Sequence, residues 1–466
     1  MYSFQKEYDL KAHSPLIHFQ WETNGATLRA TEVKPKLDRY IIKHKGENNI
    51  PESWKRDNHD KKDKTDSDNK SKKEKSFSLK YQLRIVIPEG TRVNEVYLGI
   101  KNESGEKFPK EKQIYDIYYG NMGADASQYK KGILANAKLT VTCFEEDLLK
   151  YIDEIIGDFF IVTNFGTMQS KGFGSFTVDD KDNSKDNSKG HIYDVLRKEY
   201  ADGGYCYGFK PTDKKLTFKQ IKMIYSIMKS GQNLTRVIKI IKNGNHTQRK
   251  IHIYPKTTVV NGKDYSDLYY HRSLLYQYLR KEKDMGNEKA WMKQKHIVPA
   301  LDNLGRYVIQ HDKESYYVRA LLGIGETIEY QAENGSKVKV TIKESSETIE
   351  RLDSPILFKV IDDMVYFVGR EPNEEIYGKV FDFSSDMCRE VMVLDVPARD
   401  KLPENFMNGF MAYCAKELNR YFREIREYFE YLRIYDERNY NALEPYEKNF
   451  RDISNITILR GKIKSE

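Results

Sequence analysis

Apolar residues recur along the first 180 residues at two spacings, one typical of strands and one typical of helices. Residues 77–88 alternate apolar and polar positions and predict a strand. Residues 145–165 begin with three acids and then space their apolar residues three or four apart, which predicts a helix. The remaining predicted elements are strands over 3–12, 137–144 and 173–178 and a helix over 28–43. The order β-α-β-β-α-β predicts a ferredoxin-like module.

The second half of the chain has a less regular pattern. It predicts helices over 217–229, 234–242, 266–292 and 404–435, the last with an inward stripe of aromatic residues. It predicts strands over 250–255, 316–322, 338–343, 356–361, 364–369 and 391–396. Asp362 and Asp363 separate two of these strands and indicate a hairpin. We expect a second α+β module of the same sort, with insertions.

Two polar segments of low complexity interrupt the patterned sequence. Residues 55–76 are almost all Lys, Asp, Asn and Ser, and residues 179–190 carry Asp-Asn-Ser-Lys twice. Neither segment can bury enough apolar surface to order itself. The prediction is an α+β chain of two ferredoxin-like (RRM-like) modules with insertions and a long C-terminal helix. Its parts are a module over 1–180 with a disordered insertion at 55–76, a flexible linker at 181–190, and a module over 191–466 with a basic helical insertion at 210–250.

Positive charge is concentrated in one segment. Residues 210–250 hold eleven Lys or Arg against one acid, a net charge of +10, so the other 425 residues sum to −2 within the total of +8. A basic block in an otherwise balanced chain favours a polyanionic partner, although a solvated Lys-rich face has the same composition.

Cysteine usage and hydropathy exclude several classes of protein. The four cysteines are widely scattered, which argues against a disulfide framework and against a zinc site. No apolar run reaches the roughly 18 residues of a membrane helix, and the N-terminus lacks a signal-peptide core. We expect a cytoplasmic protein without a membrane partner, a metal or a cofactor.

A basic element opens the first predicted helix. Lys34 precedes Pro35 within the predicted helix 28–43, and a residue before proline is biased away from the helical conformation, so Pro35 suits the first helical position. The N-terminus of this helix would offer free N–H groups and the positive end of the helix dipole, with Lys34 and Lys36 beside it. The pattern predicts a phosphate site, and an ordinary helix start with solvated lysines is the alternative.

A glycine-rich loop follows the second predicted helix. Gly172 and Gly174 stand two residues apart, and glycine lets a backbone bend where side chains would clash. Ser170, Lys171 and Ser175 beside them can hydrogen-bond to phosphate. This combination predicts a loop that lies along a nucleic-acid backbone.

Together these elements resemble the RAMP superfamily, the repeat-associated proteins of CRISPR systems. The first strand leads into His-Ser-Pro-Leu-Ile at 13–17, and Thr31, Val33, Lys34 and Leu37 then match the family pattern at the first helix. Pro35 stands where the family usually has Gly. The family pattern has an Arg where this chain has Asp38, with Arg39 one position on.

Two further segments extend the resemblance. The loop at 166–175 sits where the family has its glycine-rich loop. The segment Ser-Pro-Ile-Leu-Phe-Lys at 354–359 is similar to a strand in the second module of the Cmr-type (type III-B) capping subunit.

The resemblance implies guide-RNA binding in an antiviral ribonucleoprotein. Family members that cut target RNA carry an Asp between the first strand and the first helix, and residues 19–27 hold Glu22 but no Asp. We therefore expect a non-catalytic subunit of a CRISPR type III-like effector complex, with guide RNA and other subunits as partners. The predicted RNA-binding residues are Arg29, Lys34, Lys36, Arg39, Ser170, Lys171, Gly172, Phe173, Gly174, Ser175, Lys239 and Lys242.

Three alternatives stay open at this point. An ordinary RRM has Lys-Gly-Phe-Gly in its RNA-binding strand, but there the motif precedes the second helix, whereas here it follows. A metal-independent endoribonuclease that processes guide RNA would need a general base, for which His13 is the candidate. A scaffold that binds only proteins, through the C-terminal helix, would leave the basic block unexplained.

Overall fold

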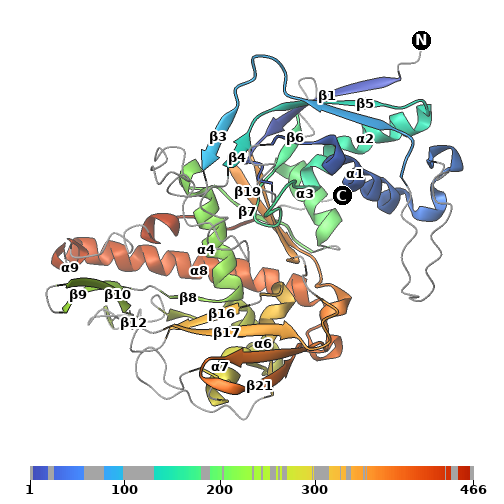
Figure 1. Cartoon of the computed structure of the whole chain (residues 1–466). Helices are drawn as coiled ribbons and strands as arrows, with labels where there is room; N and C mark the ends of the chain where they lie inside the picture. Colours follow the sequence, from blue (N-terminus) through green and yellow to red (C-terminus); the bar gives the residue numbers. More distant parts are fainter. Residues whose placement is uncertain are drawn as a thin grey trace. The chain divides into compact units, whose positions relative to one another are not determined.

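The fold is a mixture of helices and strands in several small sheets, with a long helix near the C-terminus (Figure 1). The computed structural model describes residues 4–18, 26–56, 78–97, 131–179, 189–201, 204–233, 236–242, 245–251, 259–260, 263–264, 270–295, 297–298, 314–325, 327–331, 337–349, 352, 354–435, 437–441 and 450–461. The chain divides into two compact units. The first comprises Met1–Gln113, Ala124–Val195 and Lys359–Asp362, and the second comprises Ile114–Gly123, Leu196–Phe358 and Asp363–Glu466.

The first unit is built on a four-stranded antiparallel sheet. Its strands β1 (Gln5–Ala12), β2 (Gln82–Val86), β5 (Ala137–Thr142) and β6 (Phe176–Val178) lie in the order β2-β5-β1-β6. Helix α1 (Ala30–Lys45) connects β1 to β2, and helix α2 (Glu146–Val162) connects β5 to β6. A hairpin of β3 (Asn94–Tyr97) and β4 (Lys131–Leu134) is added before β5, and α3 (Lys189–Tyr200) follows β6. The predicted order β-α-β-β-α-β is found, with this one hairpin added.

Buried and half-exposed residues alternate along β5, which shows which face of this sheet is covered. Leu139 and Val141 are buried, and Tyr8, the register partner of Leu139, donates its hydroxyl to Asp153 of α2 (2.7 Å). The helices therefore cover this face. The opposite face carries Gln5, Glu7, Asp9, Gln82, Arg84, Lys138, Thr140 and Thr142. No aromatic side chain of these three strands joins that set, so they lack the stacking platform of an RNA-binding RRM.

A second four-stranded sheet lies mainly in the second unit. Its strands β7 (Tyr207–Phe209), β18 (Ile356–Ile361), β19 (Met364–Gly369) and β22 (Leu459–Arg460) have the order β18-β19-β7-β22, and the end of β18 from Lys359 counts with the first unit. Helix α4 (Thr217–Lys229) follows β7, and helix α8 (Phe406–Tyr435) precedes β22. Numbered along the chain, the strands of this sheet are arranged 2-3-1-4, as are those of the sheet in the first unit.

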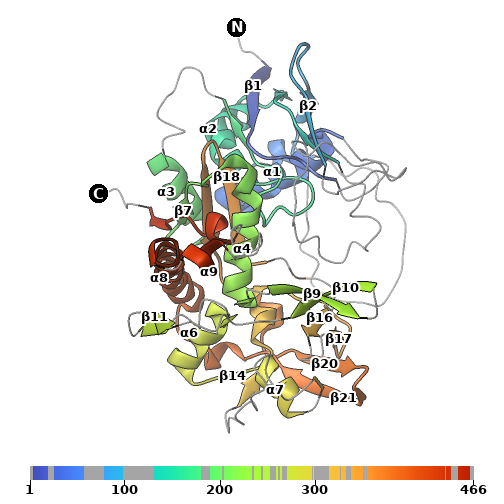
Figure 2. The same cartoon turned by 90° about the vertical axis from the view of Figure 1, so that its left-hand side faces the viewer.

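A third four-stranded sheet and several short elements separate α4 from α8. Figure 2 shows the strands of this sheet side by side, in the order β16 (Thr327–Gln331), β17 (Lys337–Glu344), β20 (Val380–Ser385) and β21 (Cys388–Asp395). The helices are α6 (Leu274–Lys283), α7 (Glu288–Gln294) and the 3₁₀ turn η6 (Val318–Leu322), with α9 (Glu437–Asn441) after α8. The two-stranded pairs are β8 (Gln232–Asn233) with β13 (Tyr270–His271), β9 (Arg236–Lys242) with β10 (Asn245–Ile251), β11 (Val259–Val260) with β12 (Lys263–Asp264), and β14 (Gly286–Asn287) with β15 (Ser315–Tyr316).

Most predicted elements are confirmed, and four are corrected. The helix predicted over 234–242 is strand β9, so the basic segment 210–250 is one helix followed by a hairpin. The helix predicted over 266–292 is broken into α6 and α7, because Asp284 adopts a left-handed conformation (φ 53°). The strand predicted over 316–322 is mostly η6. Helix α1 begins at Ala30 and not at Pro35.

Helix α8 confirms the predicted inward stripe. The seven residues that the pattern points inward are Phe406, Phe410, Tyr413, Leu418, Phe422, Ile425 and Phe429. Six of them are buried, and Tyr413 is half-buried. The predicted disordered insertion 55–76, from residue 57 onward, lies outside the described residues. So do Glu22 and residues 181–188 of the predicted linker.

Candidate nucleic-acid interface

Helix α1 starts earlier than its proline suggests. Arg29 is extended (φ −117°, ψ 139°), and its carbonyl accepts the N–H groups of Glu32 and Val33, which closes the first turn. Pro35 therefore falls in the second turn, where it removes one hydrogen bond of the helix. Val33 and Leu37 on either side of Pro35 are fully buried, which stabilises the helix through this point. A helix start at Pro35 is therefore wrong, and phosphate binding near Lys34 and Lys36 stays a prediction.

The start of α1 contacts the loop that follows α2. The carboxylate of Glu32 accepts a hydrogen bond from the backbone N–H of Gly166. Lys36 donates to the carbonyl of Asn164 (2.8 Å) and to the side-chain oxygen of Gln169 (2.7 Å). Gln169 in turn donates to the carbonyl of Gly166 (2.7 Å), so the loop is both closed on itself and tied to the helix.

The glycine-rich part of this loop turns inward. Gly174 has φ 64°, and a Cβ there would lie 1.9 Å from the carbonyl oxygen of Phe165. Phe173 and Ser175 are buried, and the Ser175 hydroxyl donates to the carbonyl of Val360 (2.5 Å). Gly172, also left-handed (φ 84°), is buried as well. These residues shape the loop, and RNA contact by their side chains stays a prediction.

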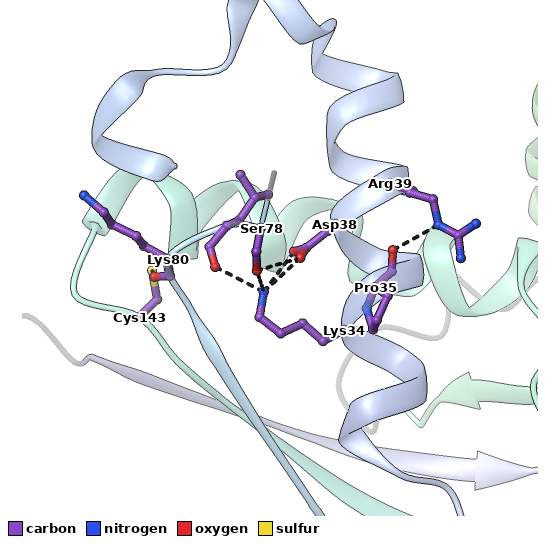
Figure 3. A network of polar contacts seen from close by, with 8 residues as sticks. Lys34, Pro35, Asp38, Arg39, Ser78, Lys80 and Cys143 are labelled. Atoms are coloured by element: carbon purple, nitrogen blue, oxygen red, sulfur yellow. Dashed lines mark hydrogen bonds and ion pairs between the residues drawn. The ribbon is translucent and has the colours of Figure 1, made fainter. Parts of the chain in front are cut away.

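Lys34 lies on a different side of α1 from Lys36. Its ammonium group donates to Asp38 (2.9 Å), to the Ser78 hydroxyl (3.0 Å) and to the carbonyl of Leu79 (3.1 Å). Figure 3 shows this network beside the helix, with Arg39 pointing away from it. Two residues along a helix correspond to about 200°, which separates Lys34 from Lys36. Lys34 thus fixes the segment before β2 to α1.

A basic stripe continues the side of α1 that contacts the loop. Residues at positions i, i+4, i+7 and i+11 share one side of a helix, which groups Glu32 and Lys36 with Arg39 and Lys43. Arg39 and Lys43 are exposed, as is Arg29 at the N-cap. In the loop, Ser170 and Lys171 are half-exposed. Among the predicted site residues, Arg29 and Arg39 are thus exposed, whereas Lys34, Lys36, Ser170 and Lys171 are half-exposed. The Nζ atom of Lys171 is itself buried.

Residues Lys359–Asp362, far along the chain, also belong to the first unit and contact the loop region. Lys359, fully buried, donates to the carbonyls of Phe160 (2.7 Å), Thr163 (2.7 Å) and Phe176 (3.3 Å). These acceptors match the three N–H bonds of an ammonium group. Burial, with a contribution from the charge of Lys36, lowers the pKa of Lys359 well below its ordinary value. The segment from Lys359 to Asp362 thereby ties the end of α2 to β6.

Two family models match the chain. The Cmr1 N-terminal domain matches residues 3–232, and the Cmr1 C-terminal domain matches residues 270–436. The chain belongs to the Cmr1 family. The resemblance to CRISPR RAMP proteins of the Cmr type is confirmed, and Cmr1 membership makes the chain a subunit of a multi-protein type III-B complex. No curated protein matches the chain.

The basic hairpin of this Cmr1-family chain lies between the two matched regions. Lys239 and Lys242 belong to β9, where their register partners on β10 are Gln248 and Asn245. The hairpin pairs with no other strand among the described residues. Among the described helices, none combines the length and apolar character that a bilayer crossing requires.

His13, the candidate catalytic base, is enclosed in the first unit. Its side chain is 3% exposed, its Nδ1 accepts the N–H of Asp362 (3.0 Å), and its Nε2 lies 2.7 Å from the Thr177 hydroxyl. Because Nδ1 accepts, Nε2 carries the proton and donates. Burial lowers the pKa of His13 from 6.5 to about 3. The ring is therefore a neutral structural contact.

Sequence reasoning missed the residues that hold the interface together. Glu32, Asn164 and Gln169 connect α1 to the loop, yet none was singled out from the sequence. Lys359 had a sequence signal, because it is the one charged residue in the apolar strand Ile-Leu-Phe-Lys-Val-Ile. A charged residue in a fully buried strand indicates a paired interior group.

Proposed function

We propose that this Cmr1-family protein is a non-catalytic subunit that binds guide RNA in its type III-B complex, on the side of α1 that contacts the 164–175 loop. We also propose that two of the three four-stranded sheets, β2-β5-β1-β6 and β18-β19-β7-β22, belong to ferredoxin-like modules. The strand arrangement 2-3-1-4 supports this, because both sheets have it. In each sheet a helix follows the first strand and another helix precedes the fourth.

One observation carries the RNA-binding proposal. Two segments about 130 residues apart converge, because Lys36 bonds to Asn164 and Gln169 while Glu32 bonds to Gly166. Arg29 and Arg39 lie on the same side of α1 as these bonds. Ser170 and Lys171 belong to the loop that the bonds hold against that side. Guanidinium groups bind phosphate through paired N–H donors, and hydroxyl and backbone N–H groups add to that.

Two other features support this reading over its rivals. The open face of the first sheet is polar and lacks aromatic side chains on β1, β2 and β5, which disfavours RRM-type stacking there. His13 is enclosed, and its lowered pKa makes it a weak base, so it is unsuited to abstract a proton from RNA. This supports a non-catalytic role.

The test is binding of fluorescent single-stranded RNA by the full chain across a salt series. We expect a dissociation constant of about 1 μM or tighter at low salt, and a logarithmic fall in affinity as salt rises. The double variant Arg29→Glu/Arg39→Glu should weaken binding at least about tenfold, because two phosphate contacts become repulsive.

Arg84→Glu is the matched control, since Arg84 is exposed on the open sheet face of the same unit. It should leave binding within about twofold of the wild type. If Arg84→Glu lost RNA binding while the double variant kept it, the RNA would lie on the open sheet face instead. Absence of salt-dependent binding by the wild type would end the proposal.

A further inference from the structure

A second cluster of cations lies in the second unit, around the end of α4. Lys229 is the last residue of α4, and its ammonium group donates to the carbonyl of Gly323 (2.6 Å), just after η6. Arg319 of η6 and Lys289 of α7 are close enough to act on it or on each other electrostatically. The one carboxylate in the group is Glu288 of α7. Three cations therefore surround one anion.

Hydrogen-bonding capacity is left over in this cluster. Arg319, whose side chain is 13% exposed, is held by Glu288, with its Nε 2.9 Å from the carboxylate. Among the described residues, the ammonium group of Lys229 donates to the carbonyls of Leu322 and Gly323. One of its three N–H groups is therefore left to bind a further acceptor.

The turn after η6 adds backbone donors. Gly323 has φ 107°, and a Cβ at Gly325 would meet no atom within 4 Å, so this turn has open space beside it. Within the described residues, the backbone N–H groups of Ile324 and Gly325 have no acceptor. Successive N–H groups in a glycine turn form a concave site for anions.

We propose that Lys229, Arg319 and the turn Gly323–Gly325 form a phosphate-binding site in the second unit. The group it would take is a phosphate with at least one negative charge, from an RNA backbone or from a free phosphate compound. The site is separate from the α1 interface, and neither proposal requires the other.

Proton uptake should accompany phosphate binding at this site. Burial, reinforced by the charge of Arg319, lowers the pKa of Lys229 to about 7 and that of Lys289 to about 8. Glu288 raises both pKa values, and Arg272 lowers that of Lys289 further. A bound phosphate favours both ammonium forms, so affinity should fall as pH rises from about 7 to about 9.

Calorimetric titration of the full chain with inorganic pyrophosphate tests the site directly. We expect binding below about 1 mM, weakened about tenfold in Lys229→Gln, which loses the charge but keeps an N–H donor for Gly323. Arg319→Lys, which keeps a positive charge beside Glu288 but loses the guanidinium fork, should also bind more weakly. Lys214→Gln removes one exposed charge before the opposite end of α4 and should bind like the wild type.

RNA titrations identify the source of the phosphate. If RNA supplies it, Lys229→Gln lowers the salt slope of RNA binding by about one, and pyrophosphate competes with RNA. If a free compound supplies it, pyrophosphate binding depends on Lys229 while the RNA slope is unchanged. Equal pyrophosphate affinity in the wild type and Lys229→Gln, or no binding at about 10 mM, overturns the site. Failure of RNA binding in the wild type counts against the proposed function alone.

Discussion

At the scale of single residues, the lysines beside the family motif have different tasks. Lys34 and Lys36 are two positions apart on α1, yet Lys34 binds the segment before β2 and Lys36 binds the loop after α2. Lys359 likewise binds the end of α2, where it donates to the carbonyl of Phe160. Each ammonium group bonds to protein oxygens, so the charge of these residues stabilises the frame on which exposed arginines such as Arg39 are presented.

His13 gives a prediction about acid stability. Its folded-state pKa of about 3 lies below the ordinary 6.5, so the unfolded chain binds an extra proton between these values. Stability therefore falls as pH drops from about 6.5 toward about 3. Between pH 6.5 and about 5, the loss due to His13 should be about 2 kcal/mol.

Urea denaturation at several pH values checks this prediction, with His13→Gln as the comparison. The variant has no imidazole to titrate, so its stability should fall less steeply over the same range. Other acid-sensitive groups, including the buried His271, are common to both proteins and cancel in the difference. Parallel pH profiles would mean that His13 is solvated in the folded protein.

At the scale of elements, the glycine-rich loop depends on backbone conformation more than on side chains. Gly174→Ala would force a side chain into a left-handed position (φ 64°) and to 1.9 Å from the carbonyl oxygen of Phe165. We expect a loss of at least about 3 kcal/mol of stability, measured by denaturant unfolding, and weaker RNA binding.

Gly157→Ala is the matched control for that change. Gly157 lies within α2 of the same unit, and an added Cβ would meet nothing within 4 Å. Alanine is favoured over glycine in a helix by up to about 1 kcal/mol, so this variant should be as stable as the wild type or more stable. If both alanine variants behave alike, the loop does not need its left-handed turn.

The elements that sequence predicted well are those whose ends are marked in the sequence. Strands 356–361 and 364–369 and helix 217–229 have the predicted bounds, because each is bounded by turn residues or by a clear change of pattern. Strand β9 was mistaken for a helix although Asn243-Gly244, a strong hairpin signal, follows it. Its β-branched residues also favour a strand, since Val and Ile are stiff in a helix.

The site was harder to predict than the fold, because it depends on contacts far apart in sequence. The glycines and the neighbouring basic residues mark where the chain turns and where charge gathers. They do not reveal that Glu32 and Lys36, rather than Lys34, would reach the loop. That choice follows from the start of α1 at Ala30, which sets the side of the helix on which each residue lies.

At the scale of the whole molecule, the charge is distributed unevenly among the elements. The segment 210–250 carries +10, and the structure divides it between α4 and the β9–β10 hairpin. The two Cmr1 models stop at residue 232 and resume at 270, so the hairpin lies between them. An element that pairs only with itself among the described strands can vary without disturbing a core.

This arrangement predicts that the hairpin contributes charge to RNA binding but little to stability. Lys239→Glu/Lys242→Glu should lower the salt slope of RNA binding by about two and weaken affinity about tenfold or more at low salt, with unchanged denaturant unfolding. Lys214→Glu/Lys215→Glu changes the same net charge at exposed positions of the same basic segment. A larger effect from the hairpin variant means that RNA follows β9, because counterion release depends on where phosphates lie. Equal effects from the two variants would instead identify the segment as a solvated face that attracts RNA only through its total charge.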